Sequence, residues 1–168
     1  FFAAKCLRPS SQKRPGGNLE YSSLFIVMFE NFILSFHRTS LAPILVVMRR
    51  IFAVKEVVEA MTAEWILYSL LDATTDEYKP SVVAVQQQVD SIEDTILGIF
   101  SFSPSHLSIT TSTSPPDPLM CRIASAKRTV TRLNRLLIPK VEMLKDLLRK
   151  GNSKFKEYTF LYMRDILD

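Results

Sequence analysis

The sequence predicts an α+β fold that is mainly α: a small β-hairpin or sheet remnant, a long antiparallel helical hairpin and the start of a further helix. Three observations support this prediction. Two β-branched and aromatic runs lie two residues apart, apolar residues recur at coiled-coil spacing over two long segments, and a polar loop divides those segments. Hydrophobic residues make up 47% of the 168 residues, which is enough for one domain or most of one.

The first third of the chain predicts a flexible start followed by part of a sheet. Residues 1–20 are rich in Pro, Gly, Ser and basic residues, so no regular structure is expected there. The runs 24–29 and 32–37 predict a tight hairpin that turns at the two residues between them. A two-stranded hairpin alone is marginal in water. Residues 21–61 are therefore interpreted as the remnant of an αβ domain, with a helix over about 43–61.

Residues 62–156 predict a helical hairpin with an acidic arm (62–100), a loop rich in Ser, Thr and Pro (101–118) and a basic arm (119–150). Apolar residues recur at intervals of three and four in both arms, which is the spacing of a coiled-coil seam. The seam residues are Val82, Val85, Val89, Ile92, Ile96 and Ile99 in the first arm and Leu119, Ile123, Ala126, Val130, Leu133 and Leu137 in the second. This spacing predicts two long packed helices and indicates little about function.

Caps and prolines predict where the helices begin and end. Thr62 is expected to cap a helix that Pro80 bends or restarts. In the basic arm the seam slips at Pro139, moving to Val141, Leu144 and Leu148, because proline removes one helix hydrogen bond. Gly151-Asn152 is expected to end this arm, and residues 157–168 to start another helix.

The net charge of +4 conceals a partition along the chain. Residues 62–100 carry seven acids against one lysine, a balance of −6. Residues 119–168 carry twelve Lys and Arg against five acids, a balance of +7. An acidic segment followed by a basic one suggests that the two lie against each other. Exposed ion pairs contribute only about 0–1 kcal/mol each, so packing is expected to provide most of the stability.

Several functional classes find no support in the sequence. No apolar stretch approaches the roughly 20 residues of a membrane-spanning helix, and the apolar start is too short for a signal peptide. Cys6 and Cys121 form no disulfide framework, and His37 and His106 lie far apart, so no zinc site is expected. There is no nucleophile–base pair or glycine-rich phosphate loop, and we predict that the chain is not an enzyme.

Both ends of the sequence look cut. Residues 157–168 continue a helical pattern without a closing glycine or proline, and the first residue is Phe1 rather than methionine. We therefore expect the chain to be part of a larger protein.

Four stretches carry a family resemblance. The hairpin, Phe25-Ile26-Val27-Met28-Phe29 with Leu34-Ser35-Phe36-His37, is followed by the tryptophan-led segment 65–80. The basic arm contains Leu136-Leu137-Ile138-Pro139-Lys140, and the chain ends with Tyr162-Met163-Arg164-Asp165-Ile166-Leu167-Asp168. In this order they resemble the cytosolic domain of the CorA family of magnesium transporters, its fungal branch in particular. The last stretch is similar to the family's Tyr-Phe-Arg-Asp-Val-Tyr-Asp-His element on its stalk helix.

The resemblance covers roughly residues 21–168 and implies a function. It implies the cytosolic regulatory part of a magnesium transmembrane transporter, which senses ions and assembles subunits. The family further implies a homo-oligomer, a pentamer, in the plasma or vacuolar membrane, with this segment on the cytosolic side. The membrane spans and the Gly-Met-Asn pore signature are missing here, and Leu167 stands where the family usually has Tyr. Ion conduction by this chain alone is therefore not expected.

Two pairs of carboxylates are candidate Mg²⁺ ligands. Asp72 and Asp76 are four residues apart, and Asp165 and Asp168 are three apart, so each pair shares a helix face. Mg²⁺ prefers oxygen ligands and typically uses one or two carboxylates. The resemblance implies that carboxylates matching Asp72 and Asp165 bind regulatory Mg²⁺ where neighbouring subunits meet. Exposed acids on helices are otherwise solvated or paired with Lys and Arg.

Two other interpretations stay open. The helical hairpin could be a cytosolic scaffold for protein–protein contact. The basic residues of the second arm could face nucleic acid, but the arm lacks aromatic residues for base stacking, so pairing with the acidic arm is favoured and no nucleic-acid partner is expected. These basic residues are Arg122, Lys127, Arg128, Arg132 and Arg135.

Overall fold

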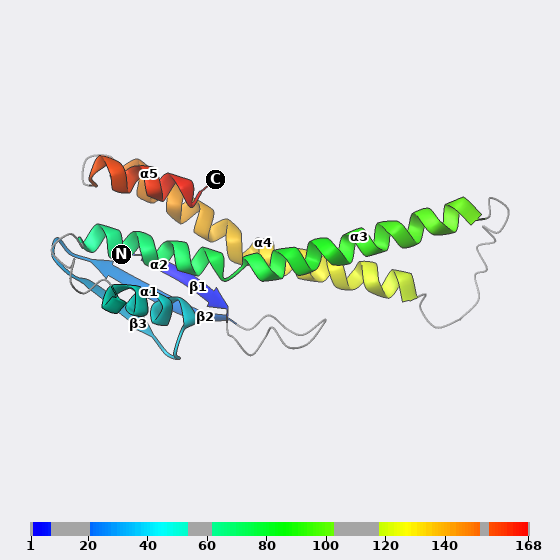
Figure 1. Cartoon of the computed structure of the whole chain (residues 1–168), viewed down its shortest axis with the longest axis horizontal. Helices are drawn as coiled ribbons and strands as arrows, with labels where there is room; N and C mark the ends of the chain where they lie inside the picture. Colours follow the sequence, from blue (N-terminus) through cyan, green and yellow to red (C-terminus); the bar gives the residue numbers. More distant parts are fainter. Residues whose placement is uncertain (1, 8–20, 54–61, 103–117, 152–154, 168) are drawn as a thin grey trace. The chain divides into compact units, whose positions relative to one another are not determined.

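A computed structural model describes residues 2–7, 21–53, 62–102, 118–151 and 155–167 (Figure 1). The chain packs as two compact units. We call Phe1–Lys79 with Arg135–Asp168 the sheet unit, and Pro80–Asn134 the hairpin unit. Among the residues that the structure describes, no helix is long and apolar enough to cross a membrane.

The sheet unit contains a three-stranded antiparallel sheet in the order β1-β2-β3. Its strands are β1 (Phe2–Leu7), β2 (Tyr21–Met28) and β3 (Ile33–His37). Strand β1 corrects the prediction that residues 1–20 have no regular structure, whereas residues 8–20 lie outside the described part. Cys6 of β1 is fully buried opposite Ser22 of β2, so long-range pairing and burial determine this strand.

The predicted hairpin turn is confirmed. The Phe29 amide donates to the Phe32 carbonyl (2.9 Å), and the two rings stack with centroids 4.4 Å apart. Glu30-Asn31 therefore forms the turn between β2 and β3. Leu34 and Phe36 of β3 share one sheet face because alternate residues of a strand point to the same side, and both are exposed.

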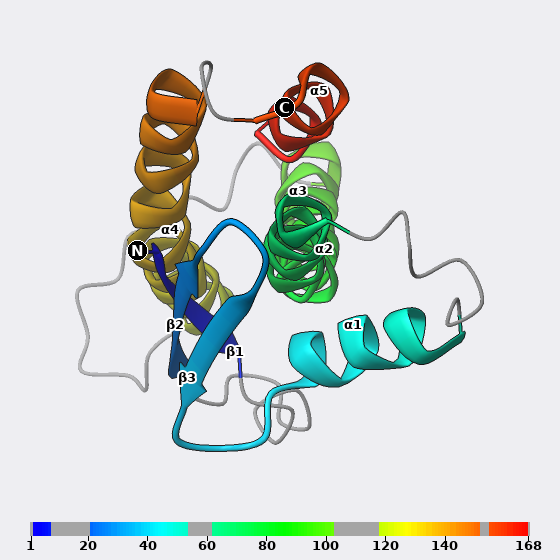
Figure 2. The same cartoon turned by 90° about the vertical axis from the view of Figure 1, so that its left-hand side faces the viewer.

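Four helical segments complete the sheet unit: α1 (Ala42–Ala53), α2 (Ala63–Asp76), α5 (Glu157–Asp165) and the second half of α4 (Pro118–Gly151). Helix α2 lies between α1 and α5 and also contacts β2 and β3 (Figure 2). The buried core draws on all of these parts: Cys6, Leu24, Ile26, Leu41, Val47, Leu67, Leu70, Leu71, Ala73, Leu144, Leu147 and Met163. Helix α1 is described only to Ala53, so its predicted end near residue 61 lies outside the described residues.

The hairpin unit pairs α3 (Lys79–Phe102) with the first half of α4, and the two run antiparallel (Figure 1). Pro80 lies in the first turn of α3, as its role in restarting the helix predicts. Ile92, Ala126 and Leu133 are buried at seam positions, whereas Ile123 and Val130 are 38% and 39% exposed. The predicted seam is therefore only partly closed.

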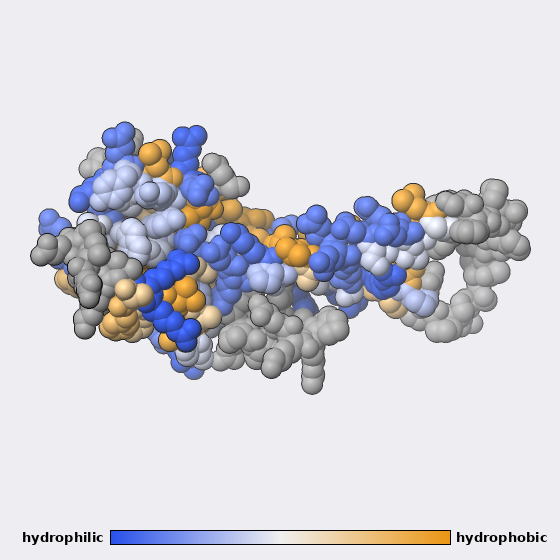
Figure 3. All heavy atoms as spheres, viewed as in Figure 1, coloured by the Kyte–Doolittle hydropathy of each residue, from blue (hydrophilic) through white to orange (hydrophobic). Residues whose placement is uncertain are grey.

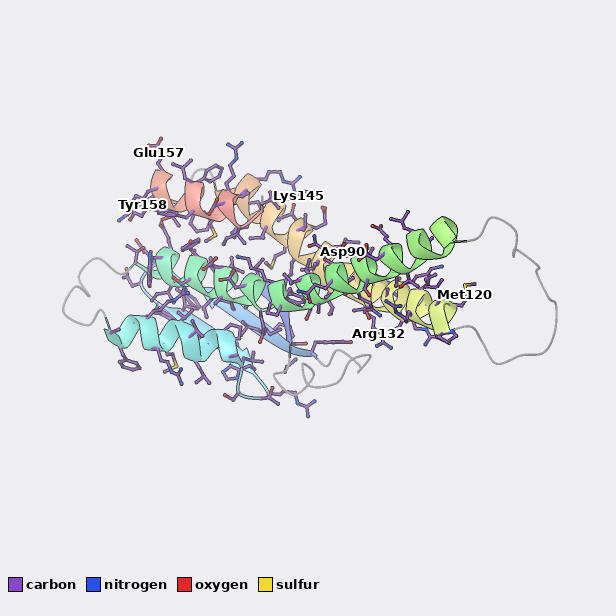
Figure 4. All side chains as sticks on the ribbon, turned by 45° about the vertical axis from the view of Figure 1, so that its right-hand side comes forward. Asp90, Met120, Arg132, Lys145, Glu157 and Tyr158 are labelled. Atoms are coloured by element: carbon purple, nitrogen blue, oxygen red, sulfur yellow. The ribbon has the colours of Figure 1, made fainter. Side chains whose placement is uncertain are left out.

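The acidic and basic arms lie against each other along α3 and the first half of α4, as the partition of charge predicts. Within the described residues, no salt bridge links the acids of α3 to the bases of α4. The polar link is instead Arg122, which donates to Ser91 Oγ (2.8 Å) and Thr95 Oγ1 (3.3 Å). Figure 4 shows Asp90 and Arg132 projecting to different sides of the helix pair, and Figure 3 shows a mostly hydrophilic surface there.

The second half of α4 confirms one position of the predicted core stripe and corrects three. Leu144 is buried as predicted, but Leu136, Lys140 and Leu147 are buried in place of Leu137, Val141 and Leu148, which are only half-buried. Two successive intervals of four residues do occur around Pro139, as expected. They run from Leu136 to Lys140 and from Lys140 to Leu144, so they place a lysine in the core. The sequence pattern missed this position because it counts only apolar residues as core.

Candidate divalent-cation site

Helix α2 positions the first pair of candidate carboxylates. Thr62 Oγ1 accepts a hydrogen bond from the Trp65 amide (3.3 Å), which confirms the predicted N-cap and fixes the start of the helix. Leu67, Leu70 and Leu71 bury one side of α2 in the core. The rotation of the helix is thereby set, and Asp72 and Asp76 keep part of their side chains exposed.

Both α2 carboxylates have a basic partner within the sheet unit. Asp72 Oδ2 lies 3.6 Å from Arg50 Nη1 on α1, and the Asp72 side chain is 30% exposed. Asp76 Oδ1 lies 2.6 Å from Lys79 Nζ. Arg50 and Lys79 were not predicted as partners of these carboxylates. The one signal was that Lys79 is the single basic residue within the acidic arm.

Helix α5 packs beside α2 in a register that places Asp165 at the same height along the helix pair as Asp72. The Lys156 amide at the start of α5 donates to Glu64 Oε2 (3.2 Å) near the start of α2. Further along, the rings of Tyr68 and Tyr162 lie with centroids 5.4 Å apart. The two helices therefore run in the same direction, and Asp165 follows Tyr162 by three residues as Asp72 follows Tyr68 by four. Tyr68 and Tyr162 were not identified from the sequence.

The electrostatics show that the carboxylates share one neighbourhood. Burial raises the pKa of Tyr68, and the negative charges of Asp72 and Asp165 raise it further, against an opposing effect of Arg50. The hydrogen bond and charge of Asp76 raise the pKa of Lys79, and the charges of Asp72 and Asp165 act in the same direction. Asp72, Asp76 and Asp165 thus contribute to one region of negative potential.

In the described part of the chain, no three His, Cys, Asp or Glu side chains are close enough together to hold a metal ion. Asp168, the fourth predicted ligand, lies outside the described residues. An open hollow of about 730 Å³ lies elsewhere, lined in part by Tyr21, Phe25 and Phe36 of the sheet, and none of the candidate carboxylates lines it.

Relatives of this chain are described as metal ion transporters. The family model described as "CorA-like Mg2+ transporter protein" matches residues 6–168, and the chain belongs to this family. The resemblance noted in the sequence is thereby confirmed.

Three relatives illustrate the similarity. A predicted metal ion transporter of Schizosaccharomyces pombe is 27% identical over 150 residues, which is 87% of this chain and 23% of the relative. Magnesium transporter ALR2 of Saccharomyces cerevisiae is 25% identical over 135 residues, covering 80% and 14%. Cobalt/magnesium transport protein CorA of Thermotoga maritima is 23% identical over 150 residues, covering 89% and 38%. The chain thus spans well under half the length of each of these relatives.

Proposed function

We propose that this chain is the cytosolic regulatory part of a magnesium transporter of the plasma or vacuolar membrane, which senses divalent ions and assembles subunits. Family membership supports the transporter class. The single observation that carries the sensing role is the level placement of Asp72 and Asp165 on the parallel helices α2 and α5. Their charges act on the same Tyr68 phenol.

The proposed mechanism is charge compensation between neighbouring subunits. Asp72 and Asp165 offer the oxygen ligands that Mg²⁺ prefers, and a water-rich coordination shell needs few protein ligands. With Mg²⁺ bound, facing carboxylates of two subunits are held together. Without it, like charges oppose each other across the interface and the assembly loosens. Asp76 and Asp168 are proposed as accessory ligands.

Arg50 and Lys79 fit this mechanism because they balance the carboxylate charge when no Mg²⁺ is bound. Each lies beside a candidate ligand. Arg50 and Lys79 are both exposed to water, and ion pairs in such surroundings are weak. A divalent ion at millimolar concentration can therefore compete with them. The protein then keeps its carboxylates oriented whether or not Mg²⁺ is bound.

The test is a magnesium titration of thermal stability at constant ionic strength. We expect millimolar MgCl₂ to raise the melting temperature of the wild type, and the double variant Asp72→Ala/Asp165→Ala to lose this rise. Asp146→Ala is the matched control, because Asp146 is an exposed helical acid paired with Arg149 (2.7 Å) outside the site. An undiminished rise in the double variant contradicts the sensing role.

The alternative function is a helical-hairpin scaffold for protein–protein contact. The observation in its favour is the hairpin unit, where Ile123 and Val130 remain partly exposed and the acids of α3 lack salt bridges to α4 within the described residues. A scaffold of this kind would bind its partner equally well with and without MgCl₂. The same titration therefore separates the two proposals.

A further inference from the structure

The end of α2 is closed by a residue from a distant part of the chain. In a regular helix the Tyr78 amide would donate to the carbonyl four residues earlier, that of Thr74. It donates instead to the Thr75 carbonyl (3.0 Å). Lys140 Nζ, 66 positions further along the chain, donates to the Thr74 carbonyl at 2.9 Å. Lys140 thus provides the donor that this helix end lacks.

The surroundings of Lys140 are unusual for a lysine. Its side chain is 5% exposed and continues the buried stripe between Leu136 and Leu144 of α4. Its Nζ lies 4.4 Å from the centre of the Tyr78 ring, a cation–π contact with a buried aromatic residue. The carboxyl-terminal end of α2 also bears partial negative charge, which favours a cation there.

Charged groups that face Lys140 do not fully offset the effect of burial on its pKa. Burial lowers the pKa of Lys140 to about 8, whereas negative charge on Cys6 of β1 and Glu77 after α2 acts in the opposite direction. Burial also raises the pKa of Cys6 to about 12, so its thiol is neutral near pH 7. Burial raises the pKa of Tyr78 too, and its hydroxyl stays neutral. Glu77 is thus the anionic member of this set at neutral pH.

A merely space-filling role does not account for a lysine here. A methionine would fill the same stripe without the cost of burying a charge. What methionine lacks is a donor for the Thr74 carbonyl, which lies between Asp72 and Asp76 in sequence. An unsatisfied buried carbonyl is costly, so the end of the helix would loosen without Lys140.

We propose that Lys140 is a positioning residue, which closes the end of α2 through the Thr74 carbonyl and thereby fixes the turns that carry Asp72 and Asp76. The closure itself stands on the hydrogen bonds at this helix end. Its consequence for ion sensing rests on the function proposed above.

The first test is amide hydrogen exchange of the full chain without magnesium. Lys140→Met keeps an unbranched side chain, one atom shorter, and removes the donor. We expect the amides of Glu77 and Tyr78 to exchange about tenfold faster, because the last turn loses its hydrogen bond from Lys140. Lys145→Met is the control, since Lys145 is exposed on the same helix and pairs with Glu142 (3.1 Å). Equal exchange in wild type and Lys140→Met overturns the proposal.

The second test uses pH and a readout that simple packing would not change. The unfolded lysine titrates near 10.4, above the folded value of about 8, so the unfolded chain binds more protons in between. The melting temperature should therefore rise between pH 7 and 9 in the wild type and in Lys145→Met. The rise should be absent in Lys140→Met, and its persistence there contradicts the assignment.

A direct measurement covers the case in which Lys140→Met does not fold. An NMR titration of the lysine side chains in the wild type should show one midpoint near 8, assigned to Lys140. A midpoint near 10.4 for Lys140 overturns the proposal.

A third experiment tests whether the closure of α2 by Lys140 affects ion binding. If the wild type responds to MgCl₂, Lys140→Met should show a weaker rise in melting temperature, and an unchanged rise refutes the positioning of Asp72 and Asp76. If the wild type shows no response, the proposed function fails. The exchange and pH tests still decide whether Lys140 closes the helix.

Discussion

The two units of the molecule differ in the number of buried residues that stabilise them. The sheet unit buries residues from strands and helices around α2, and its core is continuous from Cys6 to Met163. The hairpin unit, in its described part, buries one residue of α3 and two of α4 at the seam, and Arg122 supplies its polar link. The comparison indicates that α2 and its carboxylates are held in place by an extensive buried core. In the described part of the hairpin unit, few buried residues hold the two helices together.

The largest expected effect is a loss of stability from a core substitution in the sheet unit. Leu67 of α2 is fully buried in the core, so Leu67→Ala should cost about 2–5 kcal/mol in free energy of unfolding. Val130→Ala in the hairpin unit is the comparison, because Val130 is 39% exposed and should cost about 1 kcal/mol or less. Urea denaturation followed by circular dichroism measures both. Equal costs would remove the difference between the units.

A second prediction concerns alkaline pH. The folded pKa of Cys6, about 12, lies above its ordinary value of about 8.5, so its contribution to stability is complete below pH 8.5 and declines as pH rises. Above pH 9 this decline opposes the gain from Lys140, and the wild type should level off. In Cys6→Ala the rise should continue to about pH 10, at up to about 1.4 kcal/mol per pH unit. Urea titrations at each pH check this, and identical profiles for the two proteins contradict it.

A smaller effect is expected at Arg50. Its ion pair with Asp72 is partly exposed, so Arg50→Gln should change the free energy of unfolding by less than about 1 kcal/mol. The same change removes a competing cation from Asp72 and should lower the magnesium concentration needed for half of the stabilisation. Arg149→Gln, which breaks the Asp146 pair on α4, should leave that concentration unchanged. A higher magnesium requirement in Arg50→Gln argues against competition at this site.

An effect of similar size is expected in the hairpin unit. Arg122→Met removes the hydrogen bonds to Ser91 and Thr95, which are partly exposed, and should cost about 0.5–1.5 kcal/mol. Arg128→Met, an exposed base on the same helix without a salt bridge in the described residues, should cost almost nothing. Thermal unfolding compares them, and equal stability of the two variants would show that Arg122 does not join the arms.

Local signals in the sequence predicted much of the fold. Thr62, Pro80, the Glu30-Asn31 turn and the end of α4 at Gly151 were all identified, because each acts within a few residues of its own position. Strand β1 was missed because its pairing with β2 crosses a long separation in the sequence.

The site could be predicted only in part, for the same physical reason. Asp72 and Asp76 share a helix face by spacing alone, but the placement of Asp165 beside them depends on how α5 packs on α2. The partners Arg50 and Lys140 reach α2 from other elements, and no local pattern marks them. The partition of charge predicted that the acidic and basic arms lie against each other, but complementary net charge does not specify which side chains meet, and Arg122 pairs with Ser91 and Thr95 rather than with an acid.

Magnesium-dependent association tests the central claim most directly, because the proposal places Asp72 and Asp165 where subunits meet. Sedimentation velocity of the full chain, with and without millimolar MgCl₂ at constant ionic strength, would measure it. We predict a larger sedimentation coefficient with magnesium for the wild type and for Asp146→Ala, and no increase for Asp72→Ala/Asp165→Ala. The same increase in that double variant, or none in the wild type, would contradict ion-dependent assembly through these carboxylates.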